Sequence, residues 1–276
     1  MKRFFIYLII IWLISPSIEV NGQESLDSAS VLLESLYGRL TGNNDDKSRI
    51  QIYDSINGVI DWYVRTDTVF NHKFDNLRYL GQITSPDSTL KIVTWNAVVR
   101  NSPGKYYCYF IKKDENRKEN KIYYLSGKYN DAPVKTDTTY TSSDWYGALY
   151  YDLRPCLDGD KLLWIILGVD YGNPLISKKI IDVMEFTEDG HVIFGRKWFA
   201  SGDSYSYRAV MEYASDASMS LRFTSDKSIV FDHLVPINPS QVNNRQYYGP
   251  DYSTDSYNFE KGKWILKINV DARNKE

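Results

Sequence analysis

Two stripes of apolar side chains with the helical period stand near the start of the chain. In SLDSASVLLESLYGRLTG, and again after the polar turn at residues 43–46, apolar residues recur every three or four positions. This spacing places them on one face of a helix. The pattern predicts an antiparallel helical hairpin over residues 23–69 that covers part of the remaining chain. The stripes comprise Leu26, Ala29, Leu32, Leu33, Leu36 and Leu40, then Ile50, Tyr53, Ile56, Ile60, Tyr63 and Val64.

From about residue 70 the pattern changes to short runs rich in tyrosine and β-branched residues, separated by turn signals such as Ser85-Pro86-Asp87. Such runs are typical of strands. We expect strands at 89–99, 105–112, 121–126, 145–152, 161–168, 178–187, 191–195, 206–214, 219–224, 228–232, 255–260 and 263–270.

The expected fold class is therefore α+β: an N-terminal helical hairpin followed by a mainly antiparallel β meander. Residues 70–276 form a β-rich domain packed with the hairpin, closed into a barrel or folded into a sandwich. A small β-propeller-like fold is the alternative, because the Ser-Pro-Asp turn also occurs in propeller blades. No fixed repeat of about 40 residues runs through the chain, however.

Residues 1–22 have the features of a signal peptide. Lys2 and Arg3 give a positive start, and an apolar run from Phe4 to Ile14 follows. That run is shorter than the ~20 apolar residues of a membrane-spanning helix. We expect an exported protein, periplasmic, cell-surface or secreted, with no permanent membrane span after cleavage. In an oxidising compartment the two cysteines, Cys108 and Cys156, either form a disulfide or remain as two small apolar side chains.

The charge balance argues against nucleic acid as a partner. The formal net charge is only −2, and the chain has no long basic stripe. A protein that binds nucleic acid without sequence preference needs such a stripe to neutralise phosphates.

Four aromatic rings are concentrated in DWYGALYYDLRP: Trp145, Tyr146, Tyr150 and Tyr151. They either pack between layers of the sheet or form a platform on which a ligand stacks; packing is the favoured interpretation. Gly147 leaves room for a large neighbour or a close backbone.

A second aromatic segment, RQYYGPDYSTDSYNF, contains Gly249-Pro250, which predicts a break in any strand and hence a loop. Loops carry binding residues more often than strands do. Tyr247, Tyr248 and Tyr252 are the candidate binding residues, together with Asp251. The alternating Asp251, Ser253 and Asp255 resemble the start of a calcium loop, but an EF-hand also requires a glycine and a bidentate acid that are missing here. We therefore predict no metal.

Catalytic motifs are scarce. His233 in IVFDHLVP can act as an acid or base if it is positioned, although the adjacent Asp232 points to the other face of a strand. The chain contains no HExxH, GxSxG, P-loop or dinucleotide-binding motif. The sequence thus assigns no catalytic residue and no cofactor.

Several blocks, namely TSPDSTLKIVTWN, WYGALYYDL, GRKWF, IVFDHLVP and YYGPDYSTDSYNFEKGKWIL, resemble a set found in uncharacterised exported bacterial proteins. The resemblance covers most of residues 77–272 and implies no activity. We expect a non-catalytic envelope or surface protein that binds a glycan, a peptide or an envelope protein through aromatic loops. His233 is included among the candidate binding residues. The alternative is a hydrolase that uses His233 with nearby acids such as Asp251 or Glu212.

Overall fold

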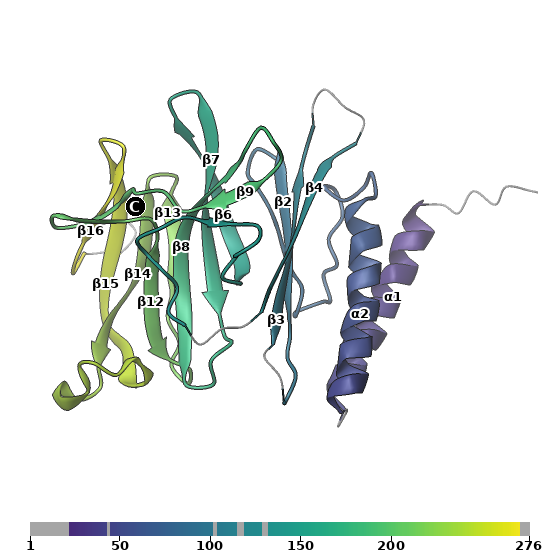
Figure 1. Ribbon diagram of the computed structural model, residues 1–276, viewed down its shortest axis with the longest axis horizontal. Coiled ribbons are helices and arrows are strands. Elements are labelled where there is room, and N and C mark those ends of the chain that lie inside the picture. The colour runs from purple at the N-terminus through teal and green to yellow at the C-terminus, as the bar shows by residue number, and fades with distance from the viewer. Residues whose placement is uncertain (1–21, 43–44, 102–103, 115–118, 129–131, 271–276) are drawn as a thin grey trace, which may run out of the picture.

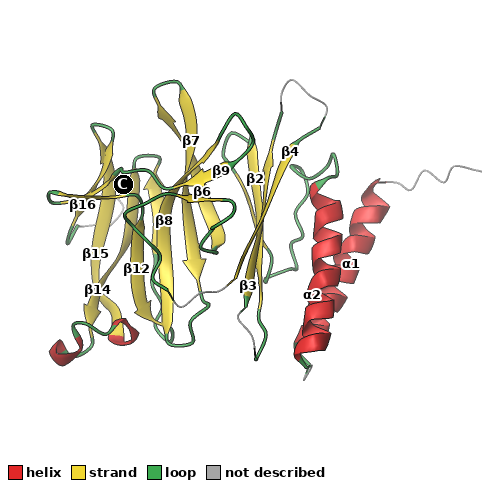
Figure 2. Cartoon of the chain, in the orientation of Figure 1, coloured by secondary structure: helices red, strands yellow, loops and turns green. Residues whose placement is uncertain are grey.

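The computed structural model describes residues 22–42, 45–101, 104–114, 119–128 and 132–270, in which two helices precede a mostly antiparallel set of strands (Figure 1). The predicted signal peptide thus lies outside the described residues, except for Gly22. The helices are α1 (Gly22–Leu40) and α2 (Asp46–Val64), and they stand together at one end of the molecule (Figure 2).

The strands form three sheets, here called A, B and C. Sheet A has the order β1-β2-β3-β4, with β1 (Gly81–Thr84), β2 (Leu90–Ala97), β3 (Lys105–Lys112) and β4 (Lys121–Lys128). Sheet B has the order β5-β9-β8-β7-β6, with β12 also paired to β8: β5 (Tyr140–Thr141), β6 (Leu149–Asp158), β7 (Lys161–Asp170), β8 (Ile176–Phe186), β9 (Val192–Phe194) and β12 (Ala209–Ala214).

Sheet C has the order β11-β10-β16-β15-β14-β13. Its only parallel pair is formed by β10 and β16. The connection from β14 to β15 contains two short 3-10 helices, η1 (Pro239–Gln241) and η2 (Arg245–Tyr247). The strands are β10 (Phe199–Ser201), β11 (Ser204–Ser206), β13 (Leu221–Ser225), β14 (Ser228–Pro236), β15 (Tyr248–Glu260) and β16 (Lys263–Lys267).

Three hydrophobic cores separate four layers: hairpin, sheet A, sheet B and sheet C. Sheets A and B are therefore buried on both faces. In β7, Trp164 and Ile166 belong to the core shared with sheet A, whereas Leu163, Ile165 and Leu167 belong to the core shared with sheet C. Alternation of side chains along a strand explains why KLLWIILG is apolar without interruption.

The expected fold class is confirmed, and the sheets form a sandwich-like stack rather than a closed barrel. The helical hairpin differs in detail from the predicted stripes. Leu32 and Ile50 are about half exposed, at 49% and 47%, whereas Ile52 is buried. Since α2 contacts both α1 and sheet A, its buried face is rotated relative to a simple stripe. Asp45 begins α2 by accepting a hydrogen bond from the Ser48 backbone N–H at 2.7 Å.

Two strand predictions are wrong. β6 begins at Leu149 rather than at residue 145, and β15 runs from Tyr248 through Pro250 where we expected a loop. Pro250 is tolerated because β16 pairs only with the second half of β15, from Ser256 onward, so residues near Pro250 have a strand on one side alone. Proline lacks an N–H and is found at such edges. The short strands β1, β5, β10 and β11 were not predicted.

The two cysteines are free thiols in different layers. Cys108 is buried in the core between sheets A and B, whereas Cys156 packs against the core between sheets B and C. Of the two outcomes left open by the sequence, the structure has no disulfide. In the described residues, neither helix is long and apolar enough to cross a lipid bilayer.

Lys91 is a charged side chain inside the core beneath α2. Its ammonium donates to the Tyr63 hydroxyl at 2.9 Å and to the backbone carbonyls of Val69 and His72, each at 2.6 Å. Burial lowers the pKa of Lys91 to about 8, and the charge of Lys73 adds to this effect. Lys91 thus fixes the segment that leads from α2 into sheet A.

This burial predicts a pH-dependent stability. Between pH 8 and the unfolded-state pKa of ~10.4, the unfolded chain holds more protons at Lys91 than the folded chain, so the free energy of unfolding rises with pH. The contribution is roughly 1–2 kcal/mol between pH 8 and 9.5. Urea denaturation over this pH range should show that the free energy of unfolding rises more steeply with pH in the wild type than in Lys91→Met. Equal slopes would contradict this account of Lys91.

Candidate functional site

The candidate residues Asp251, Tyr252 and His233 meet at one β-bulge. Register between β14 and β15 shifts so that residues 251–253 lie opposite His233 alone. At its tip, Tyr252 has a φ of 70° and is fully exposed. Asp251 accepts bonds from the Ser253 hydroxyl at 2.6 Å and backbone N–H at 3.0 Å, which lower the pKa of Asp251. Asp251 therefore closes its own turn, and a bulge rather than a loop displays the ring.

His233 is positioned by an acid from the neighbouring strand. Its Nδ1 lies 2.8 Å from Asp255 Oδ2, and Asp255 is 7% exposed. Asp232 instead accepts a bond from the Ser220 backbone N–H at 2.7 Å. Among the described residues, Asp255 is the single hydrogen-bond partner of the His233 imidazole, and no serine, threonine or cysteine is hydrogen-bonded to it. A hydrolytic site would need such a nucleophile or an activated water.

Tyr247 and Tyr248 differ in environment. Tyr247 is 40% exposed, whereas Tyr248 is 6% exposed and its hydroxyl donates to the Val242 carbonyl. The guanidinium of Arg245 covers the Tyr248 ring at 4.3 Å from its centroid. Tyr248 therefore anchors the connection between β14 and β15.

A shallow hollow of about 340 Å³ lies beside this connection and is lined by Glu212, Arg245, Leu234 and apolar side chains of β12. His233 does not line it. Of the two acids considered for a hydrolase, Glu212 thus lines a hollow that His233 does not line, whereas Asp251 shares the bulge with His233.

The aromatic segment at residues 145–151 lies mainly inside the molecule. Trp145 and Tyr150 are 4% and 1% exposed, and the Trp145 indole donates to the Tyr150 hydroxyl at 2.8 Å. A Cβ on Gly147, whose φ is 81°, would lie 2.7 Å from the Tyr106 ring. Trp145, Tyr146 and Tyr150 pack between sheets A and B, and Tyr151 packs against the core between sheets B and C, so all four rings pack between layers as the favoured interpretation predicted.

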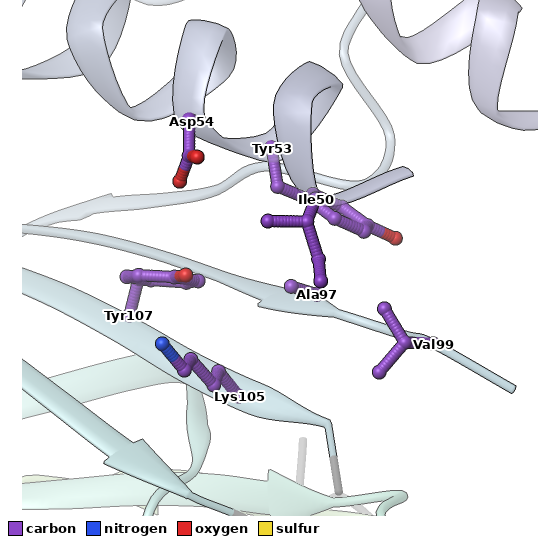
Figure 3. A pocket seen from close by; sticks show the side chains of 7 residues that line it. All are labelled: Ile50, Tyr53, Asp54, Ala97, Val99, Lys105 and Tyr107. Carbon is purple, nitrogen blue, oxygen red and sulfur yellow. The ribbon is translucent and has the colours of Figure 1, made fainter. Parts of the chain in front are cut away.

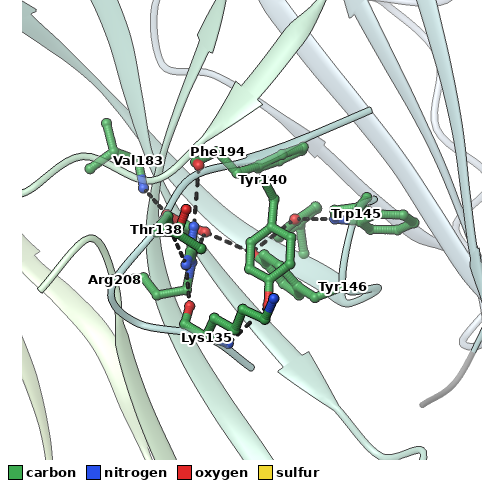
Figure 4. A network of polar contacts seen from close by, with 10 residues as sticks. Lys135, Thr138, Tyr140, Trp145, Tyr146, Val183, Phe194 and Arg208 are labelled. Carbon is green, nitrogen blue, oxygen red and sulfur yellow. Dashed lines mark hydrogen bonds and ion pairs between the residues drawn. The ribbon is translucent and has the colours of Figure 1, made fainter. Parts of the chain in front are cut away.

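Beside these rings lies a buried ion pair, shown in Figure 4. The Arg208 Nε donates to Asp182 at 2.8 Å, and the rest of the guanidinium donates to carbonyls of Lys135, Thr138 and Phe194. The Tyr146 hydroxyl also donates to Asp182, at 3.0 Å.

Complete burial raises the pKa of Asp182, while Arg208 and the donors around the carboxylate oppose the rise. The ion pair is enclosed, with both side chains 0% exposed, so it offers no surface to a ligand. Its role is to join β8, β12 and the segment before β5.

Two hollows that the sequence did not indicate lie between the hairpin and sheet A, one on each side of Tyr53. We name them the Tyr79 hollow and the Tyr107 hollow. Tyr53 accepts a hydrogen bond from the Val98 backbone N–H at 3.0 Å, and Arg49 donates to the Val98 carbonyl at 2.9 Å. These bonds fasten α2 to the end of β2 and form the wall between the hollows.

The Tyr79 hollow has a volume of about 220 Å³ and is lined by Tyr37, Arg49, Tyr53, Tyr79 and Asn96, among others. The rings of Tyr37 and Tyr79 stack at 5.9 Å with an angle of 28° between their planes. Tyr79 is 67% exposed, so one side of this pair remains open to solvent.

Tyr37 lines the Tyr79 hollow, but its hydroxyl is closed off from solvent. Tyr37 is 7% exposed, and its hydroxyl has no hydrogen-bond partner within the described part of the chain. Burial raises the pKa of Tyr37 far above its usual range, so the hydroxyl remains protonated and can donate. An unpaired buried hydroxyl costs about 1–3 kcal/mol, and such a group requires an explanation.

The Tyr107 hollow is smaller, about 100 Å³, and Figure 3 shows the side chains that line it. Ile50 and Asp54 come from α2, Ala97 and Val99 from the end of β2 and beyond, and Lys105 and Tyr107 from β3. In this view the Tyr107 ring lies between the Asp54 carboxylate and the Lys105 side chain.

No group of three or more metal-binding side chains (His, Cys, Asp or Glu) is found in the described ranges. The two hollows are lined by rings, apolar side chains, the Asn96 amide and single charges. Such groups can stack against a ligand and hydrogen-bond to it.

The buried ion pair gives the first prediction for this region. Arg208→Lys should lower the free energy of unfolding by about 3 kcal/mol, because an ammonium cannot reach all four acceptors of the guanidinium. Arg65→Lys, in an exposed pair on α2, is the matched control and should cost under ~0.5 kcal/mol. Chemical denaturation of both variants measures the difference, and equal losses would contradict the role given to Arg208.

The second prediction for this region concerns Tyr248 and Tyr252. Tyr248→Ala should destabilise the protein by about 3 kcal/mol, since it removes a buried ring. Tyr252→Ala should change stability by under ~0.5 kcal/mol. Thermal and urea unfolding distinguish the two residues. A Tyr248→Ala protein as stable as the wild type would show that its ring is not part of the packing.

Comparison of the chain with models of known protein families, with curated proteins and with solved structures gives no match.

Proposed function

We propose that this protein is an exported, non-catalytic binding protein that takes a carbohydrate in the Tyr79 hollow. The observation that carries the proposal is the Tyr79 ring, which is 67% exposed and stacks on Tyr37 at the wall of an open hollow. A sugar ring can stack on the open face of Tyr79.

The chemistry of the hollow fits a sugar. The exposed Tyr79 ring, supported by Tyr37, offers a flat face for the C–H groups of a sugar, while the Asn96 amide offers a polar partner. At ~30 Å³ per water, its volume equals about seven waters, which suits one sugar ring better than a drug-sized molecule that needs ~300 Å³ or more.

A single positive charge, Arg49, lines the Tyr79 hollow, and two of its guanidinium nitrogens are already used by backbone carbonyls of Leu40 and Val98. The hollow therefore has little charge to attract a strongly anionic ligand. A neutral, hydroxyl-rich ligand is the better match. Export is supported by the N-terminal sequence pattern alone.

The proposal is tested by titrating the protein, without its first 22 residues, with a panel of neutral oligosaccharides. Tyr79→Ala should weaken binding roughly tenfold, about 1.4 kcal/mol, because the stacking face is lost. Tyr37→Phe should leave binding unchanged and the free energy of unfolding unchanged or higher, because it removes an unpaired buried hydroxyl and keeps the ring that supports Tyr79. The contrast between the two variants assigns binding to the exposed face of Tyr79.

Tyr252→Ala is the control, since Tyr252 is exposed on sheet C and lies outside the hollow. Loss of binding in Tyr252→Ala but not in Tyr79→Ala would move the site to the bulge. If no oligosaccharide binds, or if Tyr79→Ala binds as tightly as the wild type, the proposal is wrong.

A further inference from the structure

We infer that the Tyr107 hollow is a subsite for an N-acetyl group, so that the preferred ligand is a glycan containing N-acetylated amino sugars. This inference rests on the proposed function, because the acetylated sugar belongs to the ligand held in the Tyr79 hollow. The two hollows share Tyr53 as a wall and are both lined by residues of the first half of α2 and the end of β2.

The side chains of the Tyr107 hollow are complementary to a secondary amide that ends in a methyl group. Asp54 supplies an acceptor for an amide N–H, and Lys105 supplies a donor for its carbonyl oxygen. Ile50, Ala97 and Val99 provide an apolar lining for the methyl group.

Asp54 and Lys105 are available for this task. Both are exposed, and neither side chain makes a hydrogen bond or ion pair within the described residues. A lone carboxylate or a lone ammonium would indicate a charged ligand. Since one of each sign borders the same hollow, a neutral group with one donor and one acceptor matches them together.

The size of the hollow also limits the ligand group. About 100 Å³ equals roughly three waters at ~30 Å³ each. This is room for an acetamido group of four non-hydrogen atoms and too little for a second sugar ring, which therefore has to lie outside on the surface.

A surface for that second ring adjoins the hollow. Tyr107 stacks on the buried Trp95 at 4.9 Å and on Tyr124 at 6.5 Å. Tyr124 lies on the edge strand β4 and is 46% exposed. The row of rings thus leads from the core out to an open aromatic face, which is a platform for a further sugar ring.

The experiment compares oligosaccharides of equal length that differ only in the acetamido group. β-1,4-linked N-acetylglucosamine oligomers, their deacetylated forms and the corresponding glucose oligomers are titrated against the protein. We expect at least tenfold tighter binding of the acetylated series. Lys105→Met and Val99→Phe, which remove the donor and fill the hollow, should each reduce that preference to under threefold without changing the affinity for glucose oligomers.

Lys227→Met, at an exposed turn between β13 and β14, is the matched control and should leave the preference intact. Equal binding of the acetylated and glucose series overturns the inference but leaves the proposed function standing. If Lys105→Met loses affinity for both the acetylated and the glucose oligomers, the inference is overturned as well. Absence of binding to every oligosaccharide overturns the proposed function itself. If N-acetyl-alanine amide competes as well as the acetylated sugar, the ligand is a peptide and the inference is wrong.

Discussion

The stacking of two sheets that are each buried on both faces is the constraint on which the rest of this structure depends. Sheet B has no solvent-facing side, so β7 is apolar at consecutive positions and a charge on β8 has to be neutralised internally. Asp182 is neutralised by Arg208, and Asp170 by Lys178 at 2.9 Å. Both pairs bind different segments together. Removing one partner would leave an uncompensated buried charge, which is far more costly than losing an exposed pair.

Local patterns in the sequence predicted the elements whose neighbours are close along the chain. The hairpin follows from its helical period, and β3 was placed at its observed ends because KYYCYFIK is bounded by polar residues on both sides. The first part of β15, around Pro250, was missed because the tolerance for proline there depends on where β16 stops pairing, and β16 comes later in the chain. Similarly, β6 begins late because Gly147 turns the chain against Tyr106 of another sheet.

The candidate site was beyond prediction for a related reason. The chain contains 23 tyrosines, so the presence of Tyr37, Tyr53, Tyr79 and Tyr107 carries little information. Burial converts some of them into packing residues, as with Tyr248, and leaves others at a hollow. Both places combine aromatic rings with a few polar groups, and no sequence signal distinguishes the hairpin end of sheet A from the bulge on sheet C. The exposed face of a stacked ring pair can be recognised only after every neighbour is placed.

The position of the hollows follows from a difference in width, because the two helices of the hairpin do not cover all four strands of sheet A. The hairpin covers the middle of sheet A, so Tyr79 beside β1 and Tyr124 on β4 remain exposed at its margins. Tyr53 and Arg49 hold α2 to Val98 through hydrogen bonds made within the protein itself. The walls of the hollows are therefore formed without a ligand. For the proposed carbohydrate ligand, the binding free energy is then reduced mainly by the ligand's own loss of freedom and not by ordering of the protein.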